Sequence, residues 1–143
     1  MRYGVVMDPS PVRIVAICGS LQARSSNRAL IEAAVRGAPD GVVVTPPITE
    51  NILEGITRRS AIELLKNELG LTVVERPIDR TEVGLADEFF MTGTAAQVVA
   101  ITKVDHRPIG TGAMGPVVTK LRDMFEDIVR NRNPKYAHWN LAI

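Results

Sequence analysis

Three short stretches of the chain combine small residues with hydroxyl or basic side chains, as phosphate-binding loops do. The first is the polar loop of residues 19–27, whose candidate donors are Ser20, Arg24, Ser25 and Ser26. It lies between an apolar run and a helical pattern, and free N–H groups at the start of a helix attract anions. The simpler interpretation is that Ser26 or Asn27 only caps that helix. The residue types alone slightly favour the cap.

The other two stretches are Gly55-Ile56-Thr57 and Thr92-Gly93-Thr94-Ala95. The first opens a helical pattern and the second separates two apolar strand patterns, so each offers free backbone N–H groups beside a hydroxyl. A helix N-cap at Thr57 and an ordinary hairpin turn at Gly93 would explain the same residues. Composition does not separate an anion site from these structural uses.

The remaining reactive side chains form no catalytic or metal-binding set that we recognise. His106 and His138 lack the spacing of metal ligands, and we expect a turn residue and a tail residue. Cys18 ends an apolar run with no histidine or basic partner nearby in sequence, so we expect a buried filler rather than a nucleophile. We therefore predict no catalytic residue and no metal ligand.

The elements that position these stretches are expected to form one compact domain, because 143 residues is an ordinary domain length. Apolar residues make up 45% and charged residues 23%, which excludes a disordered chain. A net charge of +1 argues against a nucleic-acid or membrane partner. One cysteine, no apolar run of about 20 residues and no leader pattern indicate a cytoplasmic protein.

Hydrophobic periodicity predicts an α/β fold. Val12–Cys18 is typical of a strand buried on both faces, and residues 28–37 have apolar side chains at helical spacing. Residues 41–44 are a second strand candidate, and the connection is long enough for the two strands to pair in parallel.

The patterns further along predict both helices and strands. The helices are expected at residues 57–69, 79–86 and 116–131, the second opened by a capping box at Asp79–Glu82. The strands are expected at residues 71–78, 88–91 and 96–104, followed by a hairpin tip at 105–107. Pro116 suits the first position of the last helix, and we expect Tyr136 and Trp139 to anchor the tail on the domain.

The first loop carries a resemblance to a known family. The pattern V-x-I-C-G-S-L…S-S-N-R-A-L, within residues 12–38, resembles the opening of the flavodoxin-like NAD(P)H-dependent FMN reductases. The resemblance implies an FMN phosphate site made by Ser20, Arg24, Ser25 and Asn27. Gln22 stands where that family usually has arginine, and the family's flavin-ring and nicotinamide loops have no counterpart downstream.

From about Asp40 to Trp139 the chain resembles the C-terminal part of branched-chain amino-acid aminotransferases, which are fold-type IV pyridoxal-phosphate enzymes. The matching phrases are DGVVVTPPITENILEGITR, ERPIDRTEVGLADEFFMTGTAAQVVAITKVDHRPIG and GPVVTKLRDMFEDIVRNRNPKYAHW. The resemblance implies a cofactor-phosphate site at Gly55, Ile56, Thr57 and Thr94. It also places Leu53 near the pyridine ring and, beside the substrate carboxylate, Gly93, Thr94 and Ala95.

A transaminase also needs a lysine that holds the cofactor as a Schiff base and an acidic partner for the pyridine nitrogen. In the family both come from a segment before D-G-x-x-x-T-P-P, where this chain has the flavodoxin-like strand and helix. Glu50 and Glu54 do not occupy the position of the acidic partner, and none of the four lysines occupies the catalytic position: Lys66, Lys103, Lys120 and Lys135. We therefore expect a fusion of residues 1–39 with residues 40–143. It should be inactive as a transaminase and bind pyridoxal phosphate weakly or not at all.

Two other functions stay open: an FMN-binding NAD(P)H-dependent reductase and a non-enzymatic assembly module. In the expected fold, a fragment of the fold-type IV large domain is completed by the N-terminal strand and helix. These two elements cover a sheet edge that would otherwise be unpaired. Incomplete cover would leave an edge that invites association, so we expect a homo-oligomer such as a dimer.

Overall fold

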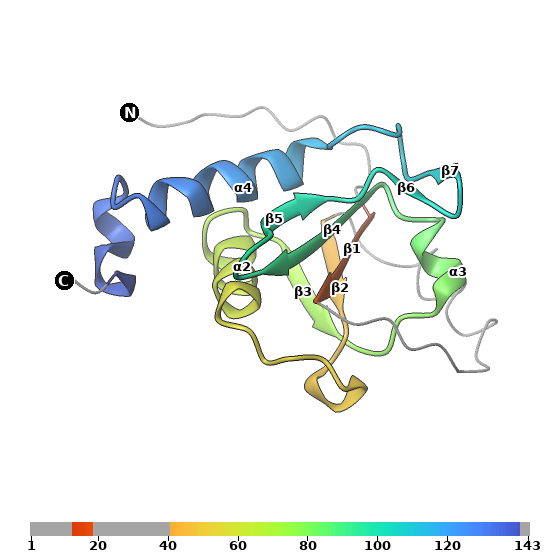
Figure 1. Cartoon of the computed structure of the whole chain (residues 1–143), viewed down its shortest axis with the longest axis horizontal. Helices are drawn as coiled ribbons and strands as arrows, with labels where there is room; N and C mark the ends of the chain where they lie inside the picture. The colour runs from red at the N-terminus through yellow and green to blue at the C-terminus, as the bar shows by residue number, and fades with distance from the viewer. Residues whose placement is uncertain (1–12, 19–40, 141–143) are drawn as a thin grey trace.

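A five-stranded mixed sheet forms the centre of the protein (Figure 1). The computed structural model describes residues 13–18 and 41–140. The strands are β1 (Arg13–Cys18), β2 (Val42–Thr45), β3 (Thr72–Glu75), β4 (Glu88–Gly93) and β5 (Gln97–Ala100), in the order β3-β2-β1-β4-β5. The first four run parallel, and β5 is antiparallel to β4. The predicted parallel pairing of β1 with β2 is confirmed.

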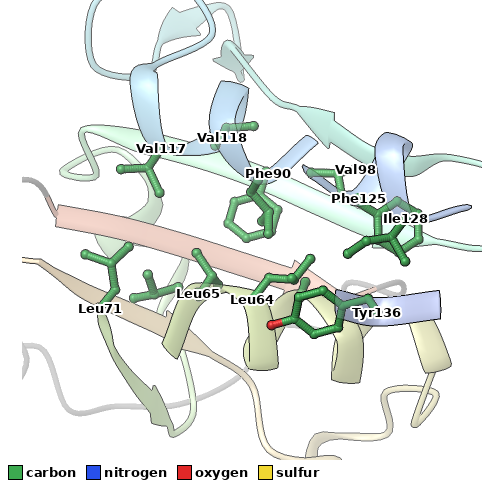
Figure 2. Close-up of a cluster of buried hydrophobic side chains, with 13 residues drawn as sticks. Leu64, Leu65, Leu71, Phe90, Val98, Val117, Val118, Phe125, Ile128 and Tyr136 are labelled. Carbon is green, nitrogen blue, oxygen red and sulfur yellow. The ribbon is translucent and has the colours of Figure 1, made fainter. Parts of the chain in front are cut away.

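Two amphipathic helices, α2 (Ile56–Asn67) and α4 (Pro116–Val129), cover one face of this sheet. Their apolar side chains recur every three or four residues and so lie on one side of each helix. Leu64, Leu65 and Val118 form one cluster with Phe90 of β4, and each is at most 1% exposed (Figure 2). Within the described ranges, no helix is long and apolar enough to cross a membrane.

A smaller apolar cluster lies on the opposite face of β4. It consists of Val83, Ala86, Phe89 and Ile109. Phe89 precedes Phe90, and successive side chains of a strand point to opposite faces. The elements beside this cluster are α3 (Arg80–Val83) and the hairpin of β6 (Lys103–Val104) and β7 (Arg107–Pro108). β4 is therefore buried on both faces at this point, as strands of parallel sheets usually are.

Two short 3-10 helices, η1 (Ile48–Glu50) and η2 (Pro134–Trp139), complete the described chain. In η2, Tyr136 is only 3% exposed, and its ring lies 4.5 Å from that of Trp139. The Tyr136 hydroxyl donates to Glu68, at the end of α2, over 2.5 Å. The predicted anchoring of the tail is confirmed.

Two predicted helix starts are also confirmed. At α3, Asp79 accepts from the backbone N–H of Thr81 at 2.8 Å, while the Glu82 carboxylate accepts from the N–H of Asp79 at 2.9 Å, which completes the capping box. At α4, Pro116 takes the first helical position.

Several element boundaries differ from the prediction. The helix α2 begins one residue early, because Gly55 rather than Thr57 is its N-cap. The strand predicted at 71–78 is reduced to β3, because the Leu71 N–H donates to the Leu65 carbonyl of α2 at 3.0 Å and Pro77 has no N–H to donate to β2. The helix α3 ends before Gly84, its C-cap.

Two further differences concern the strands around the β4–β5 turn. The strand predicted at 88–91 continues to Gly93, whose pairing with Gln97 confines the turn to residues 94–96. The strand predicted at 96–104 is divided, because the Ile101 N–H still donates to Phe89 of β4 at 2.7 Å, whereas Lys103 and Val104 pair with β7. The helix predicted at 28–37 lies outside the described residues.

Candidate functional site

The carboxyl ends of β2, β3 and β4 lie along one edge of the sheet, because these strands run parallel with β1. At this edge the chain leaves β2 at Thr45 on its way to α2, and leaves β4 at Gly93 to turn into β5 (Figure 1). β1 separates β2 from β4, which puts these two strand ends roughly 10 Å apart. Open α/β sheets bind their ligands at this edge.

The first turn of α2 offers backbone N–H groups to an anion. Gly55 is the N-cap, with φ −72° and ψ 141°, and no described side chain caps this end. The first turn also contains no acidic residue. Its N–H groups have no partner within the helix, and the helix dipole adds partial positive charge there. An external anion would satisfy both.

The two other α-helices that the structure describes have a carboxylate at this position. Asp79 caps α3 as described above. At α4, Glu88 of β4 is buried and accepts from the backbone N–H groups of Val117 at 3.0 Å and Val118 at 2.8 Å. Internal acids therefore neutralise these two helix ends, and α2 differs from both.

A buried arginine holds the first turn of α2 against the sheet. Arg58 is 5% exposed. Its Nη2 donates to the carbonyl of Pro46 at 2.8 Å and to Oε2 of Glu75 at 2.7 Å. Its Nε donates to Oγ1 of Thr45 at 3.4 Å. The start of α2 is thereby tied to the ends of β2 and β3.

The β4–β5 turn is tight and solvent-exposed. Gly93 pairs with Gln97, and both Thr94 and Ala95 in between are exposed. A Cβ built on Gly93 would meet no described atom within 4 Å, so the backbone is open to an approaching ligand there. The Thr94 hydroxyl and the amides of the turn are thus accessible at the same edge as α2.

The four lysines lie toward the opposite edge of the sheet. Lys66 stands in the last turn of α2, about 15 Å along the axis from the first turn. Lys135 is bonded to that same far end of α2. Lys120 lies about one turn into α4, which begins at Glu88, the amino end of β4. Lys103 is in β6, which follows the C-terminal end of β5, and that end is the one remote from the β4–β5 turn.

At the C-terminal end of α2, a cluster of three polar side chains shifts the pKa values of two of its members. Glu68 accepts from Lys135 and from Tyr136, each at 2.5 Å. The hydrogen bond from Lys135, followed by that from Tyr136, lowers the pKa of Glu68. Burial, followed by the hydrogen bond to Glu68, raises the pKa of Tyr136 to about 12. These groups stabilise the helix end that is remote from the candidate site.

The structure places two of the three predicted stretches at one edge of the sheet, namely Gly55, Ile56 and Thr57 with Gly93, Thr94 and Ala95. Leu53, which precedes α2, and Ile56, the first residue of α2, are 79% and 74% exposed. Both Glu50 and Glu54 are exposed in the same connection. The third stretch lies outside the described residues, with its candidates Ser20, Arg24, Ser25 and Asn27. The FMN site stays a prediction.

The two histidines lie in separate elements, His106 in the β6–β7 hairpin and His138 in η2. Across residues 41–140, no group of three or more histidine, cysteine, aspartate or glutamate side chains could hold a metal ion.

Sequence reasoning missed Arg58 and Glu88, the two buried charges that organise the starts of α2 and α4. A signal for Arg58 was available, because a cation in the first turn interacts unfavourably with the helix dipole and must be stabilised by other partners. Glu88 directly precedes Phe89 and Phe90, so a carboxylate borders a buried strand and must find donors. Its partners lie about 30 residues away, which no local pattern indicates.

Comparison with known proteins matches residues 23–104 to the amino-transferase class IV family. The branched-chain-amino-acid aminotransferase of Pseudomonas aeruginosa is 44% identical over 104 residues, which cover 73% of this chain and 33% of that protein. The branched-chain amino acid aminotransferase from Thermobaculum terrenum in its PLP form is 45% identical, with a TM-score of 0.65 over 67% of this chain and 31% of that one. The T.th. branched-chain amino acid aminotransferase complexed with N-(5′-phosphopyridoxyl)-L-glutamate is 42% identical, with a TM-score of 0.66 over 70% and 33%.

The chain spans about a third of the length of the curated relatives it matches. The family match begins at residue 23, inside the stretch that resembles FMN reductases, and the comparisons give no support to a flavodoxin-like unit or a fusion. More than half of the chain is matched, and the solved relatives share its fold. The chain therefore belongs to the amino-transferase class IV family, and its mixed α/β fold corresponds to about a third of a branched-chain aminotransferase.

Proposed function

We propose that this chain binds the phosphate group of pyridoxal phosphate between the first turn of α2 and the β4–β5 turn. We propose further that the 143-residue chain by itself does not hold the cofactor covalently and does not transfer amino groups. Both parts concern this chain, not the longer relatives.

The donors at this edge suit a phosphate group. The backbone N–H groups of Ile56 and Thr57 follow the Gly55 N-cap, where a small residue leaves room for the ligand. The hydroxyl of Thr94 can add a hydrogen bond from the neighbouring turn. A dianion also interacts favourably with the positive end of the helix dipole.

The rest of the cofactor finds fewer partners among this chain's residues. Pyridoxal phosphate supplies an electron sink to an enzyme that holds it on a lysine. Here each of the four lysines lies toward the opposite edge of the sheet, and Lys66 is about 15 Å along α2 from the first turn. The phosphate end fits this chain, and the amine that would capture the aldehyde is out of reach.

The observation that carries the proposal is the helix end itself. Internal carboxylates occupy the start of α3 and α4, while no described side chain occupies the start of α2. The relative solved in its PLP form and the relative solved with a phosphopyridoxyl ligand share the fold of this chain over 67% and 70% of its length. Together they support a phosphate-bearing pyridine compound as the ligand.

Two ligands that differ only at the aldehyde test the proposal. Calorimetric titration should give pyridoxal 5′-phosphate and pyridoxine 5′-phosphate the same affinity within about three-fold, because no lysine adds a covalent contribution. Pyridoxal without phosphate should bind at least about ten-fold more weakly, because the phosphate supplies a charge-assisted contact. A hundred-fold higher affinity for pyridoxal 5′-phosphate than for pyridoxine 5′-phosphate would instead indicate that a lysine reacts with the aldehyde, and would contradict the proposal.

Two further assays test the inactivity directly. After borohydride reduction with stoichiometric pyridoxal phosphate, intact-mass measurement should detect no specific adduct. The chain should also convert leucine and 2-oxoglutarate no faster than a buffer blank. Turnover that disappears when one of the four lysines becomes arginine would overturn this part of the proposal.

Two exposed apolar side chains at the start of α2 suggest where the rest of a ligand would lie. Leu53 and Ile56 are largely exposed next to the proposed phosphate position. We propose that Leu53 contacts the pyridine ring, and that Gly93, Thr94 and Ala95 face the carboxylate of an amino acid. Leu53→Ser should weaken binding of pyridoxine 5′-phosphate while leaving inorganic phosphate binding unchanged.

We also propose that the chain self-associates. On the sheet face opposite α2 and α4, Val74, Met91 and Val99 are 37%, 36% and 42% exposed. Parallel sheets normally bury both faces, so a second copy would remove this apolar surface from water. Light scattering across a concentration series should detect a dimer, and a monomer at the highest concentration would contradict the proposal.

A further inference from the structure

The first turn of α2 contains an arginine where helix physics disfavours one. Arg58 is the third helical residue after the Gly55 N-cap, in the region where the helix dipole favours acids. The whole residue is 5% exposed, and arginine is almost never buried unless paired. Its place therefore depends on specific partners.

Those partners belong to the ends of two strands. The guanidinium donates to Thr45 and Pro46, at the end of β2, and to Glu75, the last residue of β3. The Gly55 N-cap has no side chain that could orient this turn. Arg58 is thus the side chain in this turn that ties its direction to the sheet edge.

The ion pair between Arg58 and Glu75 also determines how positive and negative charge are distributed at this edge of the sheet. The Glu75 side chain is 48% exposed, whereas that of Arg58 is 6% exposed. The arginine is therefore held inside, and water partly screens its carboxylate partner. An anion at the start of α2 would be attracted by the buried cation and repelled by Glu75.

We propose that Arg58 is the positioning residue of the phosphate site and that Glu75 tunes its affinity. Arg58 holds the N–H groups of Ile56 and Thr57 toward the carboxyl edge, and its charge supports a bound dianion. Glu75 orients Arg58 through a bond of 2.7 Å and offsets part of its charge. This inference rests on the proposed function of the same site.

A purely structural role makes a different prediction. If the pair only stabilised the fold, loss of either partner would lower the melting temperature and leave ligand affinity unchanged in the folded protein. A positioning role instead predicts opposite effects of the two partners on affinity. Measurements of ligand affinity therefore distinguish the two roles, whereas measurements of melting temperature do not.

The test measures binding of pyridoxine 5′-phosphate by calorimetry to four variants of the full chain, with thermal unfolding in parallel. Arg58→Met should weaken binding more than about ten-fold, and Arg58→Lys, which keeps the charge but not the fork of donors, roughly five-fold. Glu75→Gln keeps an acceptor for Arg58 but removes the charge, so binding should tighten roughly two- to three-fold. Arg58→Lys and Glu75→Gln keep the test decisive if Arg58→Met does not fold.

The matched control is Arg76→Met. Arg76 follows Glu75, but its guanidinium forms a bidentate pair with buried Glu82, whose carboxylate also completes the start of α3. This variant removes the same charge and another partly buried pair, so it should lower the melting temperature with an affinity within about two-fold of the wild type.

Each outcome has one meaning. Absence of binding by the wild-type chain overturns the proposed function and this inference with it. Wild-type binding with unchanged affinity in both Arg58 variants overturns the inference alone. Equal weakening by Arg76→Met also overturns it, because the effect would then follow net charge rather than position.

Discussion

The starts of α2 and α4 are built alike and used differently. Both helices follow a glycine N-cap in an extended conformation, Gly55 at α2 and Gly115 at α4. At α4 the Glu88 carboxylate accepts from two backbone N–H groups, so the chain supplies its own anion. At α2 no described side chain does so, and a cation, Arg58, stands in the first turn instead. One helix start is capped by an internal carboxylate, and the other is where we propose that the phosphate binds.

The two helix starts also lie at opposite edges of the sheet. α4 begins at the amino end of β4, where Glu88 is the first residue of the strand. α2 begins where Arg58 contacts the carboxyl ends of β2 and β3. Position in the sheet thus decides which helix start faces the ligand edge, because ligands of parallel sheets bind at carboxyl ends.

Removal of the internal anion at α4 should have the largest effect on stability. Glu88→Ala leaves the N–H groups of Val117 and Val118 without their buried acceptor and should lower the free energy of unfolding by about 3 kcal/mol. Urea unfolding measures this loss. Glu88→Gln retains one acceptor and should lose about 1 kcal/mol. Losses below about 0.5 kcal/mol for Glu88→Ala would show that the cap contributes little.

The glycine at the start of α4 should be the next most sensitive position. A Cβ on Gly115 would lie 2.1 Å from Cδ of Glu88, so Gly115→Ala must displace the carboxylate and should cost about 2 kcal/mol. The matched control is Gly84→Ala, whose Cβ would meet only the carbonyl of Thr81 at 3.6 Å, an ordinary contact. If both variants unfold at the same urea concentration as the wild type, the close packing at α4 is wrong.

Conversion of α2 into a self-capped helix should have opposite effects on stability and binding. In Gly55→Asp, the new carboxylate can accept from the first-turn N–H groups as Glu88 does at α4. Stability should rise by about 0.5 kcal/mol. Binding of pyridoxine 5′-phosphate should fall below detection in the same calorimetric assay. Retained binding would place the phosphate elsewhere, whereas Gly55→Asn, without the charge, should bind with intermediate affinity.

The smallest effect is expected at the far end of α2. Glu68 has a pKa lowered by its hydrogen bonds from Lys135 and Tyr136, so its contribution is present above its ordinary pKa of 4.5 and is lost as the pH falls. Glu68→Gln should therefore lower stability at pH 7 by about 0.3 kcal/mol and flatten the acid side of the stability curve. Unfolding measured from pH 7 to pH 3 checks this. Phosphate affinity should stay unchanged, and a change would link the two ends of α2.

Local sequence signals predicted much of the fold. The apolar run of β2, the spacing of α2 and α4, the capping box at Asp79 and the Pro116 start each follow from a few neighbouring residues. Boundaries were less accurate where tertiary contacts decide them. Leu71, for example, belongs to a strand pattern, but its backbone N–H donates to the Leu65 carbonyl of α2, so β3 begins at Thr72.

The site was predictable in part for the same reason. Small residues marked the start of α2 and the β4–β5 turn, yet only the parallel pairing of strands places both at one edge. Arg58 and Glu88 were missed because their partners are distant in sequence. A charge within an apolar or helical pattern signals that a partner exists but does not identify it.

The central claim is that a phosphate-bearing ligand binds at the start of α2. Titration of ¹⁵N-labelled protein with pyridoxine 5′-phosphate tests it most directly, because amide shifts report on individual N–H groups. We expect saturable shifts of the amides of Ile56, Thr57 and Thr94. The amides of Val117 and Val118 should not shift, because Glu88 already occupies the start of α4. Shifts at α4 with none at α2, or none at either helix, would contradict it.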